Sequence, residues 1–264
     1  MTSAPFFLPG LDAALISAAY QAAPGNEIAS GKMASPESSS ALVANAFGYF
    51  LGKPQLLPAL PGTGDEGWPA SYLGLEAIVR FPWAGGRHPC LDVLVGTGKA
   101  LIGVESKRYE PYRAHGAPAL SDAYARPVWG DRMAPYERIR DGLGMGKLHF
   151  QRLDAAQLVK HAFGLRTAVQ PGGAHAGKAP VLFYLYAEPR AWPAGPAIGN
   201  AMLAMHMEEI TMFSSLVADA EVAFVSCTYS HLLASWSAAP DKGVRRHAVA
   251  LAAAFDLGPD QPAK

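Results

Sequence analysis

Two short apolar segments with a glycine-rich turn between them lie near the middle of the chain, and this arrangement strongly limits the possible folds. The segments cover Leu91–Val95 and Ala100–Lys107. Gly96-Thr97-Gly98 separates them, and a turn of this composition between apolar runs predicts a β-hairpin. The chain is therefore expected to contain a sheet with at least these two strands adjacent.

Charged side chains occur within these two strands. Glu105 lies 13 residues after Asp92, and Lys107 closes the second strand. Because side chains alternate faces along a strand, Glu105 and Lys107 point the same way, and Asp92 can join them if the strands pair. Two carboxylates and an ammonium on a half-buried face are costly unless they bind something. A divalent metal with a polarised water would offset that cost.

A surface hairpin with a Glu–Lys pair of little energetic value is the alternative interpretation. The apolar neighbours argue against it, because Leu94, Leu101 and Gly103 share the charged face, as in the floor of a cleft. Gly103 is expected to leave space above the sheet. The residues expected on the opposite face are Leu91, Val93, Ile102 and Val104.

The Asp92…Glu105-Ser106-Lys107 pattern resembles the PD-(D/E)XK nuclease superfamily, which has the restriction-endonuclease-like fold. The core of the match runs from about Glu76 to Glu188. A poorly characterised bacterial group of this superfamily is also similar in other stretches, which are Ser39–Gly48, Val104–Pro111, Gln157–Ala162 and Tyr184–Pro189.

The resemblance implies roles for particular residues. Asp92 and Glu105 would hold Mg²⁺ or Mn²⁺, with the backbone carbonyl of Ser106 as a further ligand. Lys107 would orient or deprotonate the attacking water. Glu76 is a candidate third carboxylate, although an acidic residue at a strand end is also common without any such role.

The helix expected after residue 152 presents three polar residues on one side. Gln157, Lys160 and His161 are spaced i, i+3 and i+4. A solvated polar face is one interpretation. The other is that the helix crosses the sheet and touches a scissile phosphate, and here the resemblance favours Gln157 first and Lys160 second.

Residues 108–152 form an Arg/Tyr-rich insertion after the third strand. From Lys107 to Arg152 the chain has nine Lys or Arg and five Asp or Glu, with aromatic residues between them. This composition is typical of a nucleic-acid groove, with Arg132, Arg138 and Arg140 as phosphate contacts. A self-packed loop is equally consistent with it. The interleaved aromatic residues are Tyr109, Tyr112, Tyr124, Trp129, Tyr136 and Phe150.

Composition sets further limits on the class of protein. The 264 residues are 50% hydrophobic, which suits one α/β domain over 1–264 with an ample core. Lys+Arg and Asp+Glu are both 22, so any nucleic-acid site must be a local patch. No apolar stretch reaches the ~18–20 residues that span a bilayer. Cys90 and Cys227 are expected to be free thiols in a cytoplasmic protein.

The expected order is helix, three strands, helix, strand, helix, strand, helix, forming a mixed sheet flanked by helices. The first strand is expected at Leu75–Phe81, and a helix before it is expected to begin at Ser35-Pro36-Glu37. Met202, Met205, Met207 and Met212 are expected to fill the core of one long helix. The remaining segments are strands at 181–187 and 222–227 and helices at 198–217, 230–238 and 244–255.

The predicted function is a Mg²⁺-dependent endonuclease-like phosphodiesterase that acts on nucleic acid, on DNA more readily than RNA, with a homodimer favoured if two sites are cut. The alternative is a catalytically inactive nuclease-fold protein with a binding or structural role, and the neutral charge favours this reading. A hydrolase of a small phosphorylated substrate is a third, weaker interpretation. If Asp92 and Glu105 hold a metal, replacing either by its amide is expected to leave the metal-free protein at least as stable.

Overall fold

A single mixed sheet organises the computed structural model, which describes residues 6–114 and 120–257. Its strands lie in the order β1-β2-β3-β4-β5. The first three form an antiparallel meander, whereas β4 and β5 add in parallel to β3. The predicted α/β class with a mixed sheet is confirmed. The strands are β1 (Tyr72–Ile78), β2 (Cys90–Gly96), β3 (Ala100–Lys107), β4 (Ala179–Tyr186) and β5 (Ala223–Thr228).

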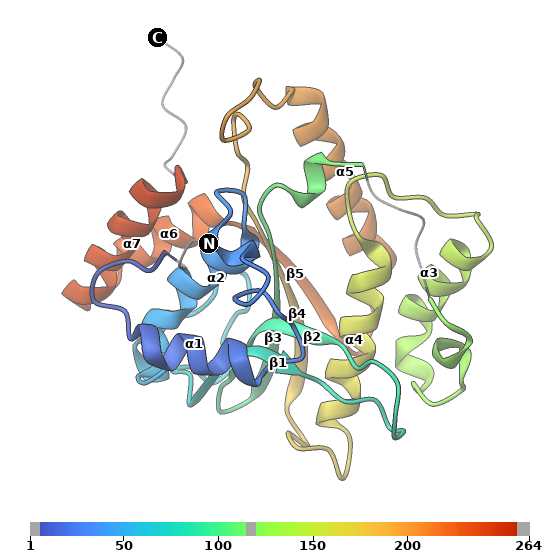
Figure 1. The fold of residues 1–264 in the computed structure, drawn as a ribbon. Coiled ribbons are helices and arrows are strands. Elements are labelled where there is room, and N and C mark those ends of the chain that lie inside the picture. The colour runs from blue at the N-terminus through green and yellow to red at the C-terminus, as the bar shows by residue number, and fades with distance from the viewer. Residues whose placement is uncertain (1–5, 115–119, 258–264) are drawn as a thin grey trace.

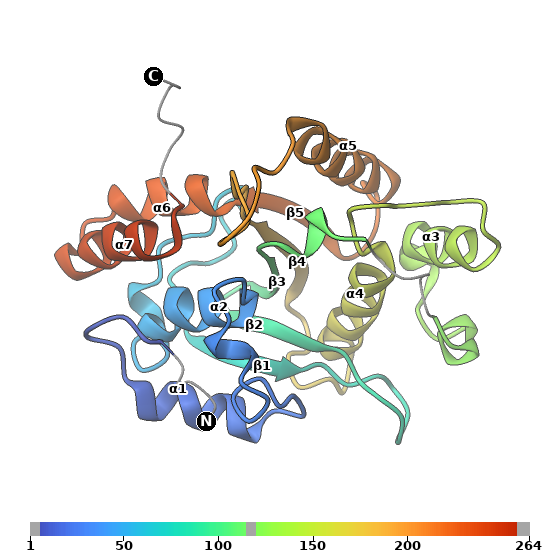
Figure 2. The same ribbon diagram turned by 45° about the horizontal axis from the view of Figure 1, so that its top comes forward.

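Helices cover both faces of the sheet (Figures 1 and 2). α1 (Ala13–Ala22), α2 (Ser39–Phe47), α6 (Tyr229–Ser237) and α7 (Lys242–Phe255) lie on one face. α3 (Ala134–Gly144), α4 (Ala155–Val169) and α5 (Asn200–Leu216) lie on the other. The chain thus forms three layers, with a separate apolar core on each side of the sheet.

Strand alternation explains the two cores. Val93, Val104 and Phe183 point toward α1, α2, α6 and α7, whereas Leu101 and Leu182 point toward α4. β4 is buried from Pro180 onward, as expected of a central strand that is covered on both faces.

Polar side chains fix where several helices begin. The carboxylate of Asp154 accepts a hydrogen bond from the Gln157 backbone N–H and so caps α4. Such N-caps satisfy backbone donors that otherwise have no partner in the helix. By fixing the residue at which α4 begins, this cap helps to set the side of the helix on which Gln157 lies. Equivalent caps come from Asp12, Ser38, Thr228 and Asp241.

Most strand and helix boundaries lie within two residues of the sequence expectation, and the largest differences concern β1, the start of α2 and the insertion. β1 begins three residues earlier than predicted and ends at Ile78. α2 is capped by Ser38, because the segment at Ser35 instead forms a turn after a short 3-10 helix. The insertion contains helix α3, which its many polar residues concealed; its buried side chains recur at Tyr136, Ile139 and Leu143.

The expected methionine core of α5 is wrong. Met202, Met207 and Met212 are exposed and Met205 is half-buried, and the buried side of the helix is made by Ile210 and Phe213 together with two polar residues. Periodicity placed the apolar face incorrectly because methionines occur on several sides of this helix. Among the described residues, no helix is long and apolar enough to cross a membrane.

Gly103 has a packing role and does not open a space. A Cβ built at this position would lie 2.6 Å from Leu91 Cδ1 and 2.9 Å from Leu165 Cδ1. The missing side chain therefore lets α4 lie close to the sheet, and the expectation of a gap above Gly103 is wrong.

Candidate active site at the split between two strands

The candidate site lies where β2 separates from β3. Their pairing ends at Val93 and Val104, so Asp92 faces Glu105 just beyond the last pair. Leu91 packs in the core beside α4, although Val93 packs in the opposite core. The strand therefore changes face at Asp92, and the expectation that Leu91 and Val93 share a face is wrong.

β1 changes face at the same level. Leu75 and Ala77 pack in different cores, and Glu76 between them has a positive φ of 48°. Because Leu75 pairs with Val93, and Ala77 with Leu91, Glu76 is opposite Asp92. A left-handed backbone is unusual for glutamate, and such conformations concentrate at functional sites. Three acidic residues thus follow one another across β1, β2 and β3.

Asp92 fills the gap left by the separating strands. Its Oδ2 accepts a hydrogen bond from the Ser106 backbone N–H at 2.6 Å. Burial raises the pKa of Asp92 well above its ordinary value, and the charges of Glu105 and Glu76 add to the rise. The side chain is therefore held in place, and its environment disfavours the negative charge of the carboxylate.

A chain of polar contacts links β3 to α4. Lys107 Nζ donates to Glu105 Oε1 at 2.6 Å and to Gln157 Oε1 at 2.8 Å. Burial acts to raise the pKa of Glu105, but Lys107 and His161 outweigh it and lower that pKa to about 2. Burial likewise acts to lower the pKa of Lys107, and the charges of Glu105 and Asp92 raise it instead. Glu105 and Lys107 are therefore ionised together at neutral pH.

His161 completes the buried side of the site. Its Nε2 lies 3.0 Å from Glu105 Oε2, and both side chains are about 2–3% exposed. Neither atom has an aligned hydrogen-bond partner among the described residues. Buried polar atoms without partners are uncommon and indicate a group that can be completed by a ligand or a water. The sequence placed His161 beside Gln157 but gave it no separate role.

Glu76 lies next to this group, at its outer side. Burial raises the pKa of Glu76 to about 7, a rise that the Cys90 thiol opposes by donating to Oε2 at 3.5 Å. The charges of Glu27 and Glu105 raise the pKa further. Its half-buried carboxylate can therefore change charge near neutral pH.

The donor set fits a hard divalent cation that keeps part of its water shell. Among the described residues, no three His, Cys, Asp or Glu side chains are grouped closely enough to enclose a metal by themselves. Mg²⁺ commonly uses only one or two carboxylates, with waters and substrate oxygens supplying the rest. Asp92 and Glu105 provide two, and Glu105 Oε2 is buried without an aligned partner. The Ser106 carbonyl is a further oxygen at the same split, because the backbone N–H and C=O of one strand residue point the same way.

The residues predicted to contact phosphate do not gather at the strand split as the carboxylates do. Lys160 lies one turn beyond Gln157 on α4, near the site. Arg132 lies at the other end of the sheet, where its carbonyl accepts from the Glu221 N–H just before β5. Arg138 is exposed on α3, and Arg140 bonds to the Tyr124 carbonyl and to acidic neighbours. Lys160 is therefore on the helix that contributes Gln157 to the site, whereas Arg132, Arg138 and Arg140 are on other elements.

Most of the aromatic residues of the insertion are core residues. Trp129 stacks on Phe163 of α4 with ring centroids 4.1 Å apart, and the Tyr136 hydroxyl donates to the Val222 carbonyl. Tyr109, Tyr112 and Tyr124 are also buried. The self-packed interpretation of residues 108–152 is therefore the better one for these side chains, within the part of the segment that the structure describes.

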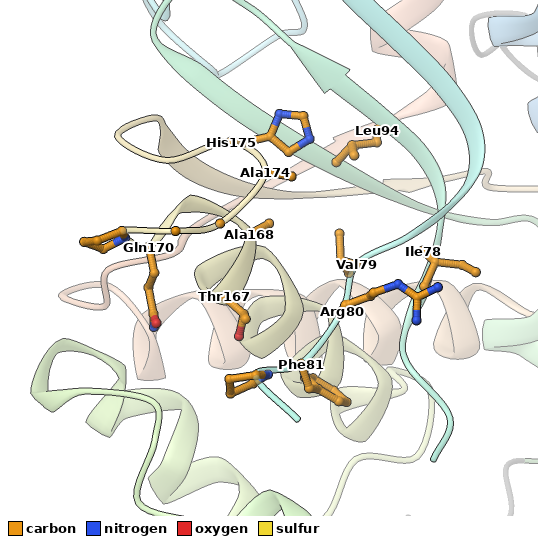
Figure 3. Close-up of a pocket in the computed structure, with 14 residues that line it drawn as sticks. Ile78, Val79, Arg80, Phe81, Leu94, Thr167, Ala168, Gln170, Ala174 and His175 are labelled. Carbon is orange, nitrogen blue, oxygen red and sulfur yellow. The ribbon is translucent and has the colours of Figure 1, made fainter. Parts of the chain in front are cut away.

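A cavity of about 550 Å³ lies at the far end of α4 (Figure 3). Arg80, Thr167 and His175 line it together with the loop that leads to β4. None of its described lining residues is acidic, and Asp92, Glu105 and Lys107 are not among them. This cavity is separate from the carboxylate site.

Comparison with protein-family models, with curated proteins and with solved structures found no match. The roles of the side chains at the strand split therefore depend on their geometry and chemistry.

Proposed function

We propose that this protein is a Mg²⁺- or Mn²⁺-dependent phosphodiesterase that cleaves nucleic acid, DNA in preference to RNA, with the restriction-endonuclease-like arrangement that the sequence resembles. One observation carries the proposal. Asp92, Glu105 and Lys107 converge at the split of β2 and β3, and Lys107 also contacts Gln157 of α4. These are the residues to which the sequence resemblance gives catalytic roles.

Asp92, Glu105 and the Ser106 carbonyl would hold the metal. A bound divalent cation would lower the pKa of a water and stabilise negative charge on the phosphate. Glu76, opposite Asp92, would accept a hydrogen bond from a water of that shell. The raised pKa values of Asp92 and Glu76 support a cation at this place, because a positive charge would relieve the repulsion among the carboxylates.

Lys107 and Gln157 would act on the water and the phosphate. In the substrate-free protein Lys107 is paired with Glu105, so its ammonium is held as a donor. The amide of Gln157 accepts from that ammonium through Oε1, which leaves its NH₂ group free to donate to a phosphate oxygen. Lys160, one turn later, would add a positive charge for the backbone of the substrate.

A second candidate is a nuclease-fold protein that binds nucleic acid or another partner without turnover. The Glu105–Lys107 contact at 2.6 Å favours it, because this ion pair occupies one carboxylate oxygen of a proposed metal ligand. The formal net charge of zero also favours a modest nucleic-acid affinity. In this case the site would keep its geometry but would not cleave.

A metal titration with labelled substrates tests the proposal. Single- and double-stranded DNA and RNA are incubated with the protein and with increasing Mg²⁺ or Mn²⁺, and the products are separated on a denaturing gel. The proposal predicts metal-dependent cleavage of DNA that Lys107→Ala abolishes. Metal-dependent binding of DNA without any product would leave the second candidate, and absence of both binding and cleavage would reject both.

A further inference from the structure

A second pocket borders α4, the helix that contributes Gln157 and His161 to the site. It has a volume of about 420 Å³ and lies between the β1–β2 connection, the segment after residue 119 and α4. Lys160 of α4 lines it, one helical turn from Gln157. A ligand group seated here would therefore be next to a phosphate held by Gln157.

Aromatic walls and positive side chains characterise this pocket. Phe81, Trp83 and Tyr124 form apolar walls, and Arg87 and Lys160 are at its edge. Phe81 and Trp83 stack with centroids 4.9 Å apart, and Lys160 Nζ lies 6.0 Å from the centre of the Tyr124 ring. None of the described residues that line the pocket is acidic. An aromatic, cationic pocket is what a flat ring joined to an anionic phosphate requires.

The aromatic walls are held by ring packing, and an exposed arginine lies over one of them. Phe81 packs edge-on against Tyr124 and Trp129, and Trp129 in turn stacks on Phe163. Trp83 is half-buried, and the exposed Arg126 lies 4.6 Å over its ring. A planar guanidinium can stack on a base or move aside, so Trp83 and Arg126 together offer a stacking surface.

We infer that this pocket receives an unpaired nucleobase of the substrate, so that the protein acts on single-stranded nucleic acid or on single-stranded segments next to a duplex. The inference rests on the proposed function, because it places the base beside the phosphate that Gln157 and Lys160 would contact. A base in a duplex is stacked and paired, and it would have to leave the helix to enter the pocket. Single-stranded substrates avoid that cost.

Binding is measured by fluorescence anisotropy with Ca²⁺ in place of Mg²⁺, so that cleavage does not interfere. The probes are a labelled oligothymidylate of about a dozen nucleotides, an abasic oligomer of equal length and charge, and a blunt duplex. The parent protein should bind the oligothymidylate about tenfold more tightly than either of the others, in line with the energy of base–aromatic stacking.

Trp83→Leu should weaken oligothymidylate binding about tenfold and leave binding of the abasic oligomer unchanged. Trp192→Leu is a matched control. Trp192 is also half-buried, stacks on a neighbouring ring (Tyr109, 5.4 Å) and lies beneath an arginine (Arg113, 5.2 Å), but it lines a different cavity. Ser121→Leu narrows the pocket without removing an aromatic residue, so the test does not depend on the folding of Trp83→Leu.

Equal affinity for the three probes, or equal effects of Trp83→Leu on the oligothymidylate and the abasic oligomer, would overturn the inference. A loss of binding in Trp192→Leu alone would also overturn it and would assign the base to the other cavity. Base-dependent binding without cleavage in Mg²⁺ or Mn²⁺ would support the base-binding role of the pocket and reject the proposed nuclease activity. If the protein cleaves duplex and Trp83→Leu does not alter that cleavage, the nuclease activity would be supported and the base-binding role of the pocket would be rejected.

Discussion

The charges at the strand split and the arginines of α3 lie on opposite sides of α4, and their environments differ. Glu105 is buried and the Lys107 side chain is only 15% exposed, and both are ionised and joined to α4 through Gln157 and His161. Arg138 is exposed to solvent, and Arg140 is occupied by its own neighbours. A solvated arginine needs no function to explain it, whereas a buried group of charges is costly unless it is used. This difference favours the strand split over the insertion as the functional region.

The largest expected effect is on catalysis. Lys107→Ala should lower the cleavage rate by at least about a thousandfold while substrate affinity stays nearly the same, because the proposed role of the ammonium is to act on the water in the transition state. Arg138→Ala, which removes an exposed charge of α3, should leave the rate unchanged. Single-turnover cleavage and DNA binding are measured for both. Equal losses of cleavage rate in Lys107→Ala and Arg138→Ala would contradict the claim that the strand split, and not α3, is the functional region.

The two carboxylates of the split should respond in opposite ways when the protein is metal-free. Glu105→Gln leaves the buried ammonium of Lys107 without its anion and should lower the free energy of unfolding by about 3 kcal/mol. Asp92→Asn removes a disfavoured charge, keeps an acceptor for the Ser106 N–H, and should raise the melting temperature at pH 8. This revises the expectation from the sequence that both changes would be harmless. Thermal melts in EDTA measure both; a stabilising Glu105→Gln would contradict the ion-pair account.

The contribution of Glu76 to the stability of the metal-free protein should fall as the pH rises from about 4.5 to 7. Glu76 has a folded-state pKa of about 7 against an ordinary value of 4.5, so in this window the folded state retains a proton that the unfolded state has lost. The stabilising contribution is complete below the lower value and is lost above the higher one. Glu76→Gln should reduce the slope, and Asp92→Asn should reduce it further. Urea unfolding at several pH values tests this; an unchanged slope in Glu76→Gln would contradict the burial of its carboxyl group.

The smallest effect is expected for nucleic-acid affinity. Lys160→Gln should weaken binding of all sequences severalfold and lower the dependence of log Kd on log salt by about one unit, as the loss of one phosphate contact requires. Arg132→Gln should change neither, because Arg132 lies at the other end of the sheet. Titrations at several salt concentrations compare the two variants. If Arg132→Gln weakened binding more than Lys160→Gln, the nucleic-acid groove would instead lie along residues 108–152.

The sequence predicted most of the sheet because its strands have strong local signals. β3 was predicted over its full length, since an apolar run with a glycine turn before it has no competing interpretation. The roles of Gly103 and Leu91 could not be predicted, because both depend on how closely α4 approaches and on where β2 changes face. The methionines of α5 were misplaced for a similar reason. Periodicity locates an apolar side only when such residues are confined to one side.

The candidate site was predictable in its residue types but not in its connections. Strand alternation and spacing group Asp92, Glu105 and Lys107, and the family resemblance gives these three residues and Gln157 their expected roles. The approach of His161 to Glu105 without an aligned hydrogen bond could not be predicted, because it depends on how α4 is rotated and how closely it packs against the sheet. Trp83 and Tyr124 line the same pocket, which could not be predicted because the two residues are far apart in the chain.

The central claim is that the strand split binds a divalent metal, and Mn²⁺ binding followed by electron paramagnetic resonance tests it most directly. The parent protein and Arg138→Gln should bind Mn²⁺ weakly, and more tightly when a non-cleavable oligonucleotide supplies phosphate oxygens. Asp92→Asn and Glu105→Gln should lose that binding. If Asp92→Asn binds Mn²⁺ as the parent does, or if the parent binds none even with the oligonucleotide present, the strand split is not a metal site.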